Sequence, residues 1–239
     1  MDNGWNQSAD AWIASQGDHG DFGRRYVLDP VMLPRALAAS PSRALDVGCG
    51  EGRFCRQLSE AGVAATGIEP TPALVGAARA RGPGGQYLRG VGEHLPFGDE
   101  CFDLVVSYLT LVDIADSDAA IREMARVLAP GGTLLIANLS GFSSASADDG
   151  WCRSLLGHRR HYPIDRYLQE RAMWVEWRGI RIVNHHRPMR RYMQALLAAG
   201  LTLTWFDEPE PVAGAPADRA AQYRRVPWFV VMEWRKGRD

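Results

Sequence analysis

The segment Ala44-Leu45-Asp46-Val47-Gly48-Cys49-Gly50-Glu51-Gly52 decides how this chain folds. A short apolar run carries the acid Asp46 into three alternating glycines, and residues 54–61 then have the pattern of a helix. Glycine has no Cβ, so it accepts positive φ and allows a ligand to lie directly on the backbone. A strand that turns through such a loop into a helix directs free N–H groups toward a ligand. Asp46 adds a negative charge beside this loop. That charge favours a ligand with both a carboxylate and a positively charged group, and it disfavours a pyrophosphate.

A second short apolar run, residues 64–69, ends in another acid, Glu69. In doubly wound folds an acid at the end of the second strand accepts hydrogen bonds from ribose hydroxyls. A nicotinamide dinucleotide site is the alternative, and its fingerprint is G-x-G-x-x-G. Here the spacing is G-x-G-x-G, and Arg53 stands where the third glycine would be. The pattern therefore disfavours a dinucleotide, and Glu69 disfavours a turn without a ligand.

The rest of the chain alternates strand and helix patterns, which predicts an α/β fold with a parallel sheet and helices on both faces. The predicted strands are residues 43–47, 64–69, 86–90, 102–107, 133–138, 201–206 and 228–234. The predicted helices are residues 53–61, 72–81, 117–128 and one that opens at Pro188 and stops at Gly200. Residues 174–183 look like two further strands joined by a turn at Arg178-Gly179.

Five motifs in order resemble the class I S-adenosylmethionine-dependent methyltransferases, in particular their small ubiquinone-methyltransferase-like (type 11) branch. They are residues 45–52, Gly67-Ile68-Glu69-Pro70, Gly92-Glu93-His94-Leu95-Pro96-Phe97, Phe102-Asp103-Leu104-Val105-Val106-Ser107 and Arg126-Val127-Leu128-Ala129-Pro130-Gly131-Gly132. The resemblance implies a Rossmann-like, doubly wound sheet of seven strands whose last strand is antiparallel. It also implies S-adenosyl-L-methionine as cofactor and S-adenosyl-L-homocysteine as product.

The resemblance also implies a set of cofactor-binding residues. Asp46, Gly48, Cys49 and Gly50 would hold the methionine half, Glu69 the ribose, and Pro70, Leu74, Gly92 and Glu93 the adenine. Tyr108 and Leu109 would lie at the methyl group, where an aromatic face attracts a cation. The alternative for Glu93 is a solvent-exposed loop acid that does not contact the adenine. The alternative for Tyr108 is a half-buried side chain that only packs against its neighbours. Val91 departs from the family, which has an Asp here that accepts from the adenine amine.

Composition limits the class of protein. The 239 residues suit one domain with a sizeable core, and a net charge of −1 gives no general attraction to DNA. No run approaches the roughly 18 apolar residues of a membrane span, and no signal peptide is visible, so we expect a cytoplasmic protein without a membrane partner. Asp113, Asp116 and Asp118 could suggest a metal site, but Asp116 or Ser117 more simply caps the next helix, and we expect no metal.

Two segments outside the core are candidates for a substrate cover. We expect residues 1–41 to form an N-terminal lid, 42–138 the cofactor-binding core, 139–187 a substrate-cap insertion, and 188–239 a C-terminal helix and β-hairpin. From Trp151 to Arg191 there are ten arginines against three acids, with aromatic residues between them. Arginine forks suit carboxylate or phosphate, so a cap over an acidic or aromatic substrate is one interpretation, and a solvated surface is the other.

The candidate acceptor-binding residues come from these two segments: Arg25, Tyr26, His161, Tyr162, His186 and Arg187. His186 lies in a His-Arg-Pro turn that resembles one in relatives, and it could take a proton from an attacking hydroxyl or amine. The alternative for His186 is a capping or packing role.

The sequence thus favours a methyltransferase that acts on a small molecule, at oxygen rather than nitrogen or carbon and in secondary metabolism. The alternatives are a methyltransferase of modified tRNA or protein, a non-catalytic cofactor-binding partner subunit and, more distantly, a dehydrogenase.

Overall fold

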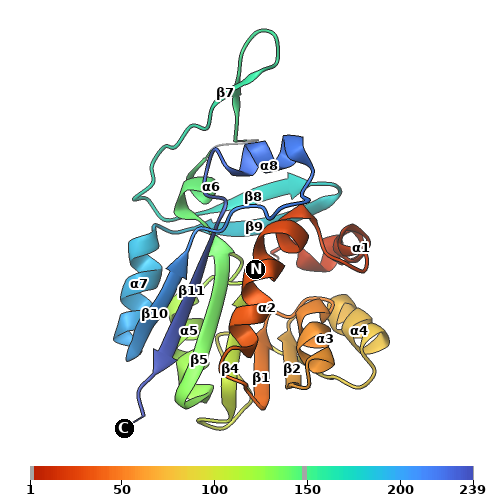
Figure 1. Cartoon of the computed structure of the whole chain (residues 1–239), viewed down its shortest axis with the longest axis vertical. Helices are drawn as coiled ribbons and strands as arrows, with labels where there is room; N and C mark the ends of the chain where they lie inside the picture. The colour runs from red at the N-terminus through yellow and green to blue at the C-terminus, as the bar shows by residue number, and fades with distance from the viewer. Residues whose placement is uncertain (1–2, 147–149, 239) are drawn as a thin grey trace.

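The computed structural model describes residues 3–146 and 150–238 (Figure 1). Its centre is a seven-stranded sheet in the order β10-β11-β5-β4-β1-β2-β3. The strands are β1 (Arg43–Val47), β2 (Ala64–Glu69), β3 (Gln86–Arg89), β4 (Phe102–Tyr108), β5 (Leu128–Leu139), β10 (Leu201–Asp207) and β11 (Phe229–Lys236). Strand β11 is antiparallel to both β5 and β10, whereas the pairs among β1 to β5 are parallel. The predicted doubly wound sheet with an antiparallel last strand is confirmed.

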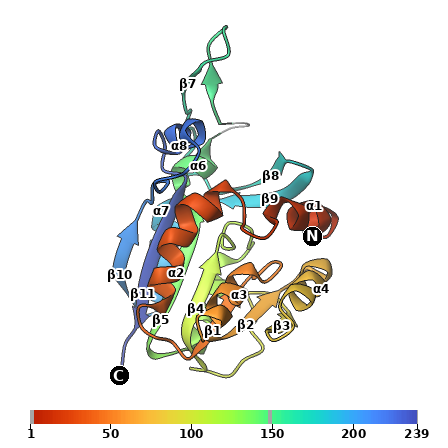
Figure 2. The same ribbon diagram turned by 45° about the vertical axis from the view of Figure 1, so that its right-hand side comes forward.

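Helices cover both faces of this sheet because successive side chains of its strands point to opposite sides. In β1, Ala44 packs with η1 (Arg24–Leu28), α2 (Asp29–Leu37), α3 (Arg53–Glu60) and α4 (Pro72–Arg81) on one face. Its neighbour Leu45 packs with α5 (Ser117–Val127) and α7 (Met189–Ala198) on the other face. Figure 2 shows α2 and α3 lying along one side of the sheet. The strands and helices expected in the core therefore form where the sequence places them.

Residues 3–41 are largely helical, which the sequence pattern does not reveal. Helix α1 (Trp5–Gln16) precedes η1 and α2, and it lies against the hairpin of β8 (Arg171–Trp177) and β9 (Ile180–His186). The Val183 backbone N–H donates to the Asn3 carbonyl at 3.0 Å. The Ser8 hydroxyl bridges the Arg181 carbonyl and N–H at 3.0 and 2.9 Å. The chain start is thus fastened to the insertion that follows β5, across the carboxyl ends of the sheet.

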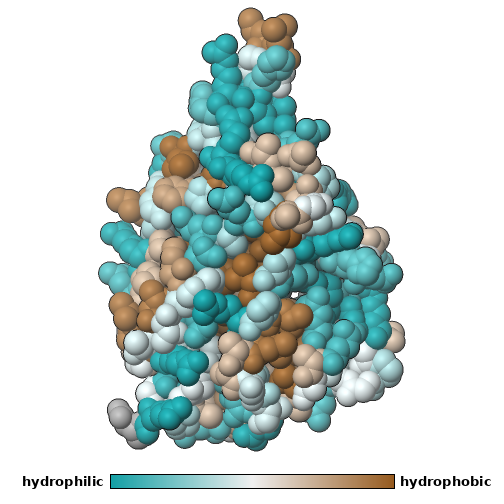
Figure 3. Space-filling model, viewed as in Figure 1, coloured by the Kyte–Doolittle hydropathy of each residue, from teal (hydrophilic) through white to brown (hydrophobic). Residues whose placement is uncertain are grey.

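The insertion contains α6 (Gly141–Ala145), the strands β6 (Cys152–Arg153) and β7 (Arg159–His161), and the predicted β8–β9 hairpin. The β6–β7 hairpin projects away from the body, and hydrophobic surface gathers at its tip in Figure 3. Leu155 and Leu156 are fully or mostly exposed there. Helix α8 (Ala217–Tyr223) lies between β10 and β11 in sequence and borders the same end of the sheet (Figure 1). Within the described residues, no helix is long and apolar enough to cross a membrane.

We predict that Gly4→Ala releases α1 from the β8–β9 hairpin. A Cβ at Gly4, whose φ is +83°, would lie 2.1 Å from the Arg181 carbonyl oxygen, which belongs to the backbone and cannot move aside alone. Limited proteolysis should cleave the variant within residues 1–20 at a rate at least several-fold above wild type. The matched control is Gly17→Ala, since Gly17 also has positive φ but meets nothing within 4 Å. Equal cleavage of the two variants would contradict the prediction.

Candidate active site

The glycine loop between β1 and α3 is held open at the carboxyl end of the sheet. Gly48, Gly50 and Gly52 have φ of +75°, +56° and +79°. The N–H groups of Gly48 and Cys49 donate to the Ile68 carbonyl at 2.8 and 3.1 Å, which ties the loop to β2. At these angles a side chain would be strained, and a Cβ on Gly48 would lie 2.2 Å from the Thr110 methyl group. The backbone of the loop therefore stays accessible from above the sheet.

Glu69, at the end of β2, lies beside this loop. One of its carboxylate oxygens accepts from the Gly50 N–H at 3.2 Å, and the other accepts from the Thr71 N–H at 2.9 Å. Burial raises the pKa of Glu69, and the hydrogen bonds from Thr71 and Gly50 oppose that shift. Each oxygen retains a further lone pair, so the carboxylate is oriented and can still accept two hydroxyl donors.

A cavity of about 1260 Å³ opens over the loop and continues to the N-terminal segment and the insertion. A single small-molecule site usually measures roughly 300–1,000 Å³, so this cavity has room for two ligands. The end above β1, β2 and α4 is lined by Gly48, Gly50, Glu69, Pro70, Leu74, Val91, Gly92 and Glu93. The lining of the cavity also includes eight aromatic residues, namely Trp5, Trp12, Phe22, Trp174, Trp177, Tyr223, Trp228 and Phe229.

Asp46 lies next to this cavity, in a smaller hollow of about 50 Å³. The two spaces share Trp12, Arg24, Gly48, Gly50 and Tyr108 as lining residues. One carboxylate oxygen of Asp46 faces the Cys55 thiol at 3.6 Å, and the other is buried without a hydrogen-bond partner. Burial raises the pKa of Asp46 to about 7. Such an acceptor is costly to bury unless a ligand satisfies it.

These residues suit S-adenosylmethionine in three respects. The unpartnered oxygen of Asp46 could accept from the cofactor's ammonium group. Glu69 could accept from two ribose hydroxyls. Gly92 leaves a flat wall for the adenine, because a Cβ there would lie about 3.0 Å from the Val47 side chain.

All eleven predicted cofactor-binding residues line one of the two connected spaces. Asp46 and Cys49 line the smaller one, and the larger one is lined by Gly48, Gly50, Glu69, Pro70, Leu74, Gly92, Glu93, Tyr108 and Leu109. Cys49 is the exception in orientation. Its thiol points to the Gly50 carbonyl and the Gly67 position, so it contributes a small packed side chain rather than a ligand contact.

Tyr108 is fixed by a polar cluster beneath the cavity. Its hydroxyl donates to Asp29 at 2.7 Å, and Asp29 also holds the Arg53 guanidinium at 2.6 and 2.9 Å. The edge of the Phe54 ring packs on Tyr108. Burial raises the pKa of the Tyr108 phenol well above its usual value, so the group stays neutral.

The prediction that Arg25 and Tyr26 face the acceptor is not supported, because the π-turn of η1 rotates them away. Arg25 stacks on the Tyr26 ring, and neither lines the cavity. Their neighbour Arg24 lines it instead, paired with Asp21 at 3.0 Å and stacked on Trp12. The arginine of this segment that lines the cavity is therefore Arg24, one position before the predicted Arg25.

His161 and Tyr162 also lie outside the cavity lining. His161 is exposed at the end of the projecting β6–β7 hairpin. Tyr162 packs between Trp151 and Trp228 and donates to the Ser143 carbonyl at 3.2 Å. Tyr162 therefore supports Trp228 from behind, and Trp228 does line the cavity.

His186 is fully buried away from the cavity, so its position matches the packing alternative. Its Nδ1 is 2.8 Å from the Ser144 hydroxyl, and its Nε2 is 2.9 Å from the Tyr167 carbonyl. Burial lowers the pKa of the imidazole, which keeps it neutral. With both ring nitrogens engaged by the protein, His186 has no free nitrogen for an acceptor proton.

Arg187, predicted to bind the acceptor, is buried and holds the loop after β4. Its guanidinium donates to the carbonyls of Leu111, Ile114 and Ala115 at 3.2, 2.8 and 2.7 Å. The His-Arg-Pro turn is thus a structural joint between the insertion and the loop 109–116. Among the insertion's arginines only Arg178 lines the cavity.

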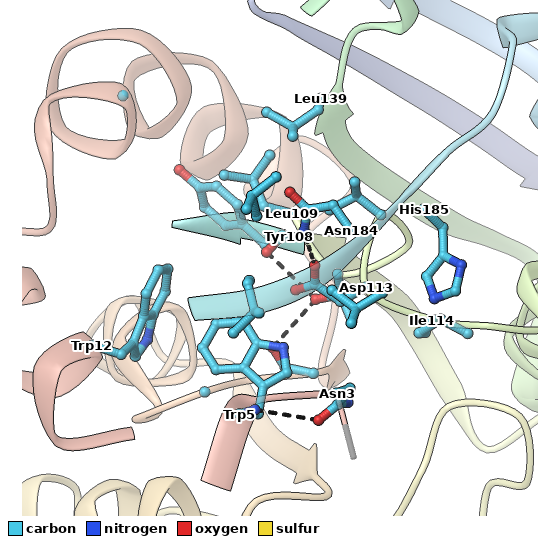
Figure 4. A pocket seen from close by; sticks show the side chains of 18 of the residues that line it. Asn3, Trp5, Trp12, Tyr108, Leu109, Asp113, Ile114, Leu139, Asn184 and His185 are labelled. Carbon is cyan, nitrogen blue, oxygen red and sulfur yellow. Dashed lines mark hydrogen bonds between the residues drawn. The ribbon is translucent and has the colours of Figure 1, made fainter. Parts of the chain in front are cut away.

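Several lining residues were missed by the sequence analysis. Asn184 and His185 of β9 and Trp5 and Trp12 of α1 line the cavity but were not among the predicted site residues. Asp113 was considered only as a metal ligand, whereas the structure places it in the cavity wall (Figure 4). Within residues 3–146 and 150–238, no group of three His, Cys, Asp or Glu side chains is arranged to hold a metal ion.

We predict that the affinity for S-adenosylhomocysteine falls as the pH drops from 8 to 6. Asp46 is ionised above a pKa of about 7 and protonated below it, and only the carboxylate attracts the ligand's ammonium group. Asp46→Asn should bind about 10- to 150-fold more weakly, which corresponds to the loss of a charge-assisted hydrogen bond of about 1.5–3 kcal/mol. Calorimetric titration at several pH values measures both effects. A variant that keeps the wild-type pH dependence would exclude Asp46 as its source.

We also predict that Val91→Asp tightens S-adenosylhomocysteine binding by about 2- to 10-fold, through a new hydrogen bond of about 0.5–1.5 kcal/mol to the adenine amine. Val91 lines the cavity and is 44% exposed, so the substitution needs no rearrangement. Val212→Asp is the matched control, since Val212 is 39% exposed and does not line the cavity. Unchanged affinity in Val91→Asp would mean that the adenine lies elsewhere.

Comparison with known proteins agrees with this geometry. Residues 45–136 match the family described as "Methyltransferase domain". An S-adenosylmethionine-dependent methyltransferase from Mesorhizobium loti superposes with a TM-score of 0.76 and 29% identity, over 92% of this chain and 100% of that one. Malonyl-[acyl-carrier protein] O-methyltransferase of Serratia marcescens is 30% identical over 147 residues, which are 62% of this chain and 55% of the relative. The same-named protein of Pectobacterium atrosepticum is 32% identical over 138 residues, 56% of this chain and 54% of the relative.

The chain therefore spans about half the length of the curated relatives it matches. The matched domain contains the glycine loop, Glu69 and the strands that carry them. The family match, the sheet with its single antiparallel strand and the solved relative together lead to one conclusion: residues 45–136 of this chain form a methyltransferase domain of the S-adenosylmethionine-dependent kind.

Proposed function

We propose that this chain transfers a methyl group from S-adenosylmethionine to a hydroxyl oxygen of a small acceptor with an aromatic or other largely apolar body. The observation that carries this proposal is the single cavity that joins the glycine loop and Glu69 to a wall of aromatic side chains. Ligand sites combine an apolar lining with a few well-placed polar groups, and this cavity has that character.

The aromatic end of the cavity supports an apolar acceptor. Trp12 lies over the glycine loop, with its indole nitrogen 3.5 Å from where a Cβ of Gly50 would be. The rings of Trp228 and Tyr223, which also line the cavity, lie 5.2 Å apart between centroids. Flat side chains of this kind bury a large area with little loss of entropy, and they select ring systems by stacking.

The chain's own residues would bind, orient and shield the reactants. When bound, S-adenosylmethionine supplies a methyl group on a sulfonium, whose S–C bond breaks with both electrons staying on sulfur as a neutral thioether. Asp46, the glycine loop and Glu69 would fix that cofactor, and Tyr108 and Leu109 would border its methyl group. Helix α1 and the β8–β9 hairpin would exclude water. Holding two reactants in line contributes roughly 7–11 kcal/mol to such reactions.

The arginines of the insertion give little support to an acidic acceptor deep in the cavity, because several of their guanidinium groups already bind carbonyls or carboxylates of the protein. Arg171 donates to the Ala145 carbonyl, Arg187 to the loop after β4, and Arg191 pairs with Asp118 at 2.6 Å. Arg178 and Arg219 are the exposed cations among the lining residues.

Within this proposal, residues 1–41 act as the lid and residues 139–187 as the cap.

A second candidate is O-methylation of a carboxylate on a carrier-bound acyl group, which the names of the curated relatives suggest. The exposed Arg178 and Arg219 favour it, since they could attract an acidic carrier. Asp113 in the cavity wall disfavours it, because two carboxylates in one largely apolar cavity repel each other.

The test begins with calorimetric titration of the chain with S-adenosylhomocysteine, with NAD as control, followed by assays of S-adenosylhomocysteine release. The probes are 2-naphthol, 7-hydroxyflavone, malonyl-pantetheine and malonyl-acyl carrier protein. We expect binding of S-adenosylhomocysteine but not of NAD, and methyl ether formation from at least one phenol. Leu139→Trp should abolish that turnover without weakening S-adenosylhomocysteine binding, because Leu139, at the end of β5, lines the cavity but is not among the residues proposed to hold the cofactor.

Leu197→Trp is the matched control, since Leu197 is 57% exposed on α7 outside the cavity. Methylation of the malonyl probes alone would favour the second candidate. Cofactor binding without turnover of any probe would contradict both.

A further inference from the structure

Asp113 is an acid in the wall of the cavity that the cofactor site does not use. It follows β4 by five residues, and the turn that carries it is closed by the Asp113 N–H donating to the Thr110 carbonyl at 2.8 Å. The neighbouring Thr110 hydroxyl reaches the Gly48 carbonyl at 3.3 Å, so the turn adjoins the glycine loop. Asp113 is only partly exposed, and it lines the same cavity as that loop.

The loop that carries Asp113 is rigidly held. The His185 N–H donates to the Val112 carbonyl at 2.6 Å, and the three carbonyl bonds from Arg187 fix residues 111–115 from below. A catalytic group needs such support, because misplacement by about 1 Å can cost two orders of magnitude in rate.

Two side chains from different segments donate to the Asp113 carboxyl (Figure 4). The Asn184 amide, from β9, donates at 2.5 Å, and the Trp5 indole, from α1, donates as well. The three residues lie together in the cavity wall beside His185 and Ile114. The carboxyl is therefore oriented by the cap on one side and by the lid on the other.

We infer that Asp113 is the catalytic base, which accepts the hydroxyl proton of the acceptor while Asn184 and Trp5 orient its carboxylate. This inference rests on the proposed methyl transfer to oxygen. As the acceptor oxygen forms its bond to the methyl carbon, its O–H bond breaks and the proton passes to the Asp113 carboxylate. The products are a methyl ether, a neutral thioether and a carboxylic acid, and the acid returns its proton to solvent when the cavity opens.

The electrostatic surroundings suit proton exchange near neutral pH. Burial raises the pKa of Asp113 to about 8, the hydrogen bond from Asn184 opposes that shift, and Glu69 on β2 raises the pKa further. Arg24 on η1 and the Trp5 indole on α1 lower it. His185 on β9 also lines this wall, and burial lowers its pKa so that the imidazole stays neutral. A base with a pKa near the working pH is the favourable case for general base catalysis.

The experiment compares wild type and Asp113→Asn with 2-naphthol and 7-hydroxyflavone as acceptors. We expect kcat to fall by about 100-fold, the low end for loss of a general base, with S-adenosylhomocysteine affinity and KM within about two-fold of wild type. Asn keeps the size of the side chain and an oxygen that accepts from Asn184 and Trp5. Wild-type kcat should rise with pH to a plateau above about 8, because only the ionised carboxylate accepts a proton. The variant should lack that titration.

Asp116→Asn is the matched control. Asp116 lies in the same loop, is exposed and caps α5 through the Ala119 N–H at 2.9 Å, a role that Asn also fills. A second measurement follows the aspartate carboxyl carbons by ¹³C NMR in the full chain. One signal titrating between pH 7 and 9 should be absent from Asp113→Asn.

The outcomes separate this inference from the proposed function. If wild type turns over and Asp113→Asn matches it within two-fold, Asp113 is not the base. If the variant loses S-adenosylhomocysteine binding along with turnover, its role is structural and the inference falls. If wild type binds S-adenosylhomocysteine but methylates no phenol, the proposed acceptor class is wrong. In the NMR titration, an Asp113 carboxyl signal that titrates below pH 5 would independently overturn the assignment of Asp113 as the base.

Discussion

The hydrogen bond between the Gly50 N–H and the Glu69 carboxylate joins the carboxyl ends of the first two strands, and the rest of the site is arranged around it. It is possible only because β1 and β2 are parallel neighbours and because the glycines between β1 and α3 adopt positive φ. A side chain at Gly48 would collide with Thr110, and Thr110 begins the turn that carries Asp113. The cofactor loop and the candidate base are therefore adjacent parts of one packed edge of the sheet.

Above that edge, the cover of the cavity is assembled from segments that are far apart in sequence. The chain start is fastened to β9 by backbone bonds at Asn3 and by Ser8, and β9 is fastened to the loop after β4 by His185 and Arg187. Trp5 and Asn184 reach Asp113 from opposite sides of this assembly. The contact of α1 with β9 thus also completes the polar environment of Asp113. The coupling gives a physical reason why a loosened α1 would affect chemistry as well as access.

The buried charges divide into structural and available groups according to their partners. Arg53 and Asp29 satisfy one another and hold Tyr108, and Glu51 binds both Arg56 and Arg81 beneath the glycine loop. Asp46 and Asp113, in contrast, have raised pKa values because burial is not offset by a cation in contact. Such groups destabilise the fold as carboxylates unless a ligand or a proton satisfies them, and raised pKa values of this kind are common at functional sites. His186 belongs to the structural class because the protein already occupies both of its nitrogens.

The sequence by itself determined the sheet, its main helices and the cofactor end of the cavity. Those features depend on local patterns: alternating apolar residues, glycines at fixed spacing and an acid at the end of each of two strands. The order of the edge strands β10 and β11 came from the family resemblance, not from periodicity. The tertiary structure alone decided which residues of the N-terminal segment and the insertion line the cavity. Arg24 lines the cavity and Arg25 does not, and His185 lines it whereas His186 does not. Neighbouring residues of a helix or strand point to different sides, and which side faces the cavity is set by what the element packs against. Asp113 became a candidate base only when folding placed Trp5 and Asn184 beside it, a contact between segments more than 70 residues apart in the chain.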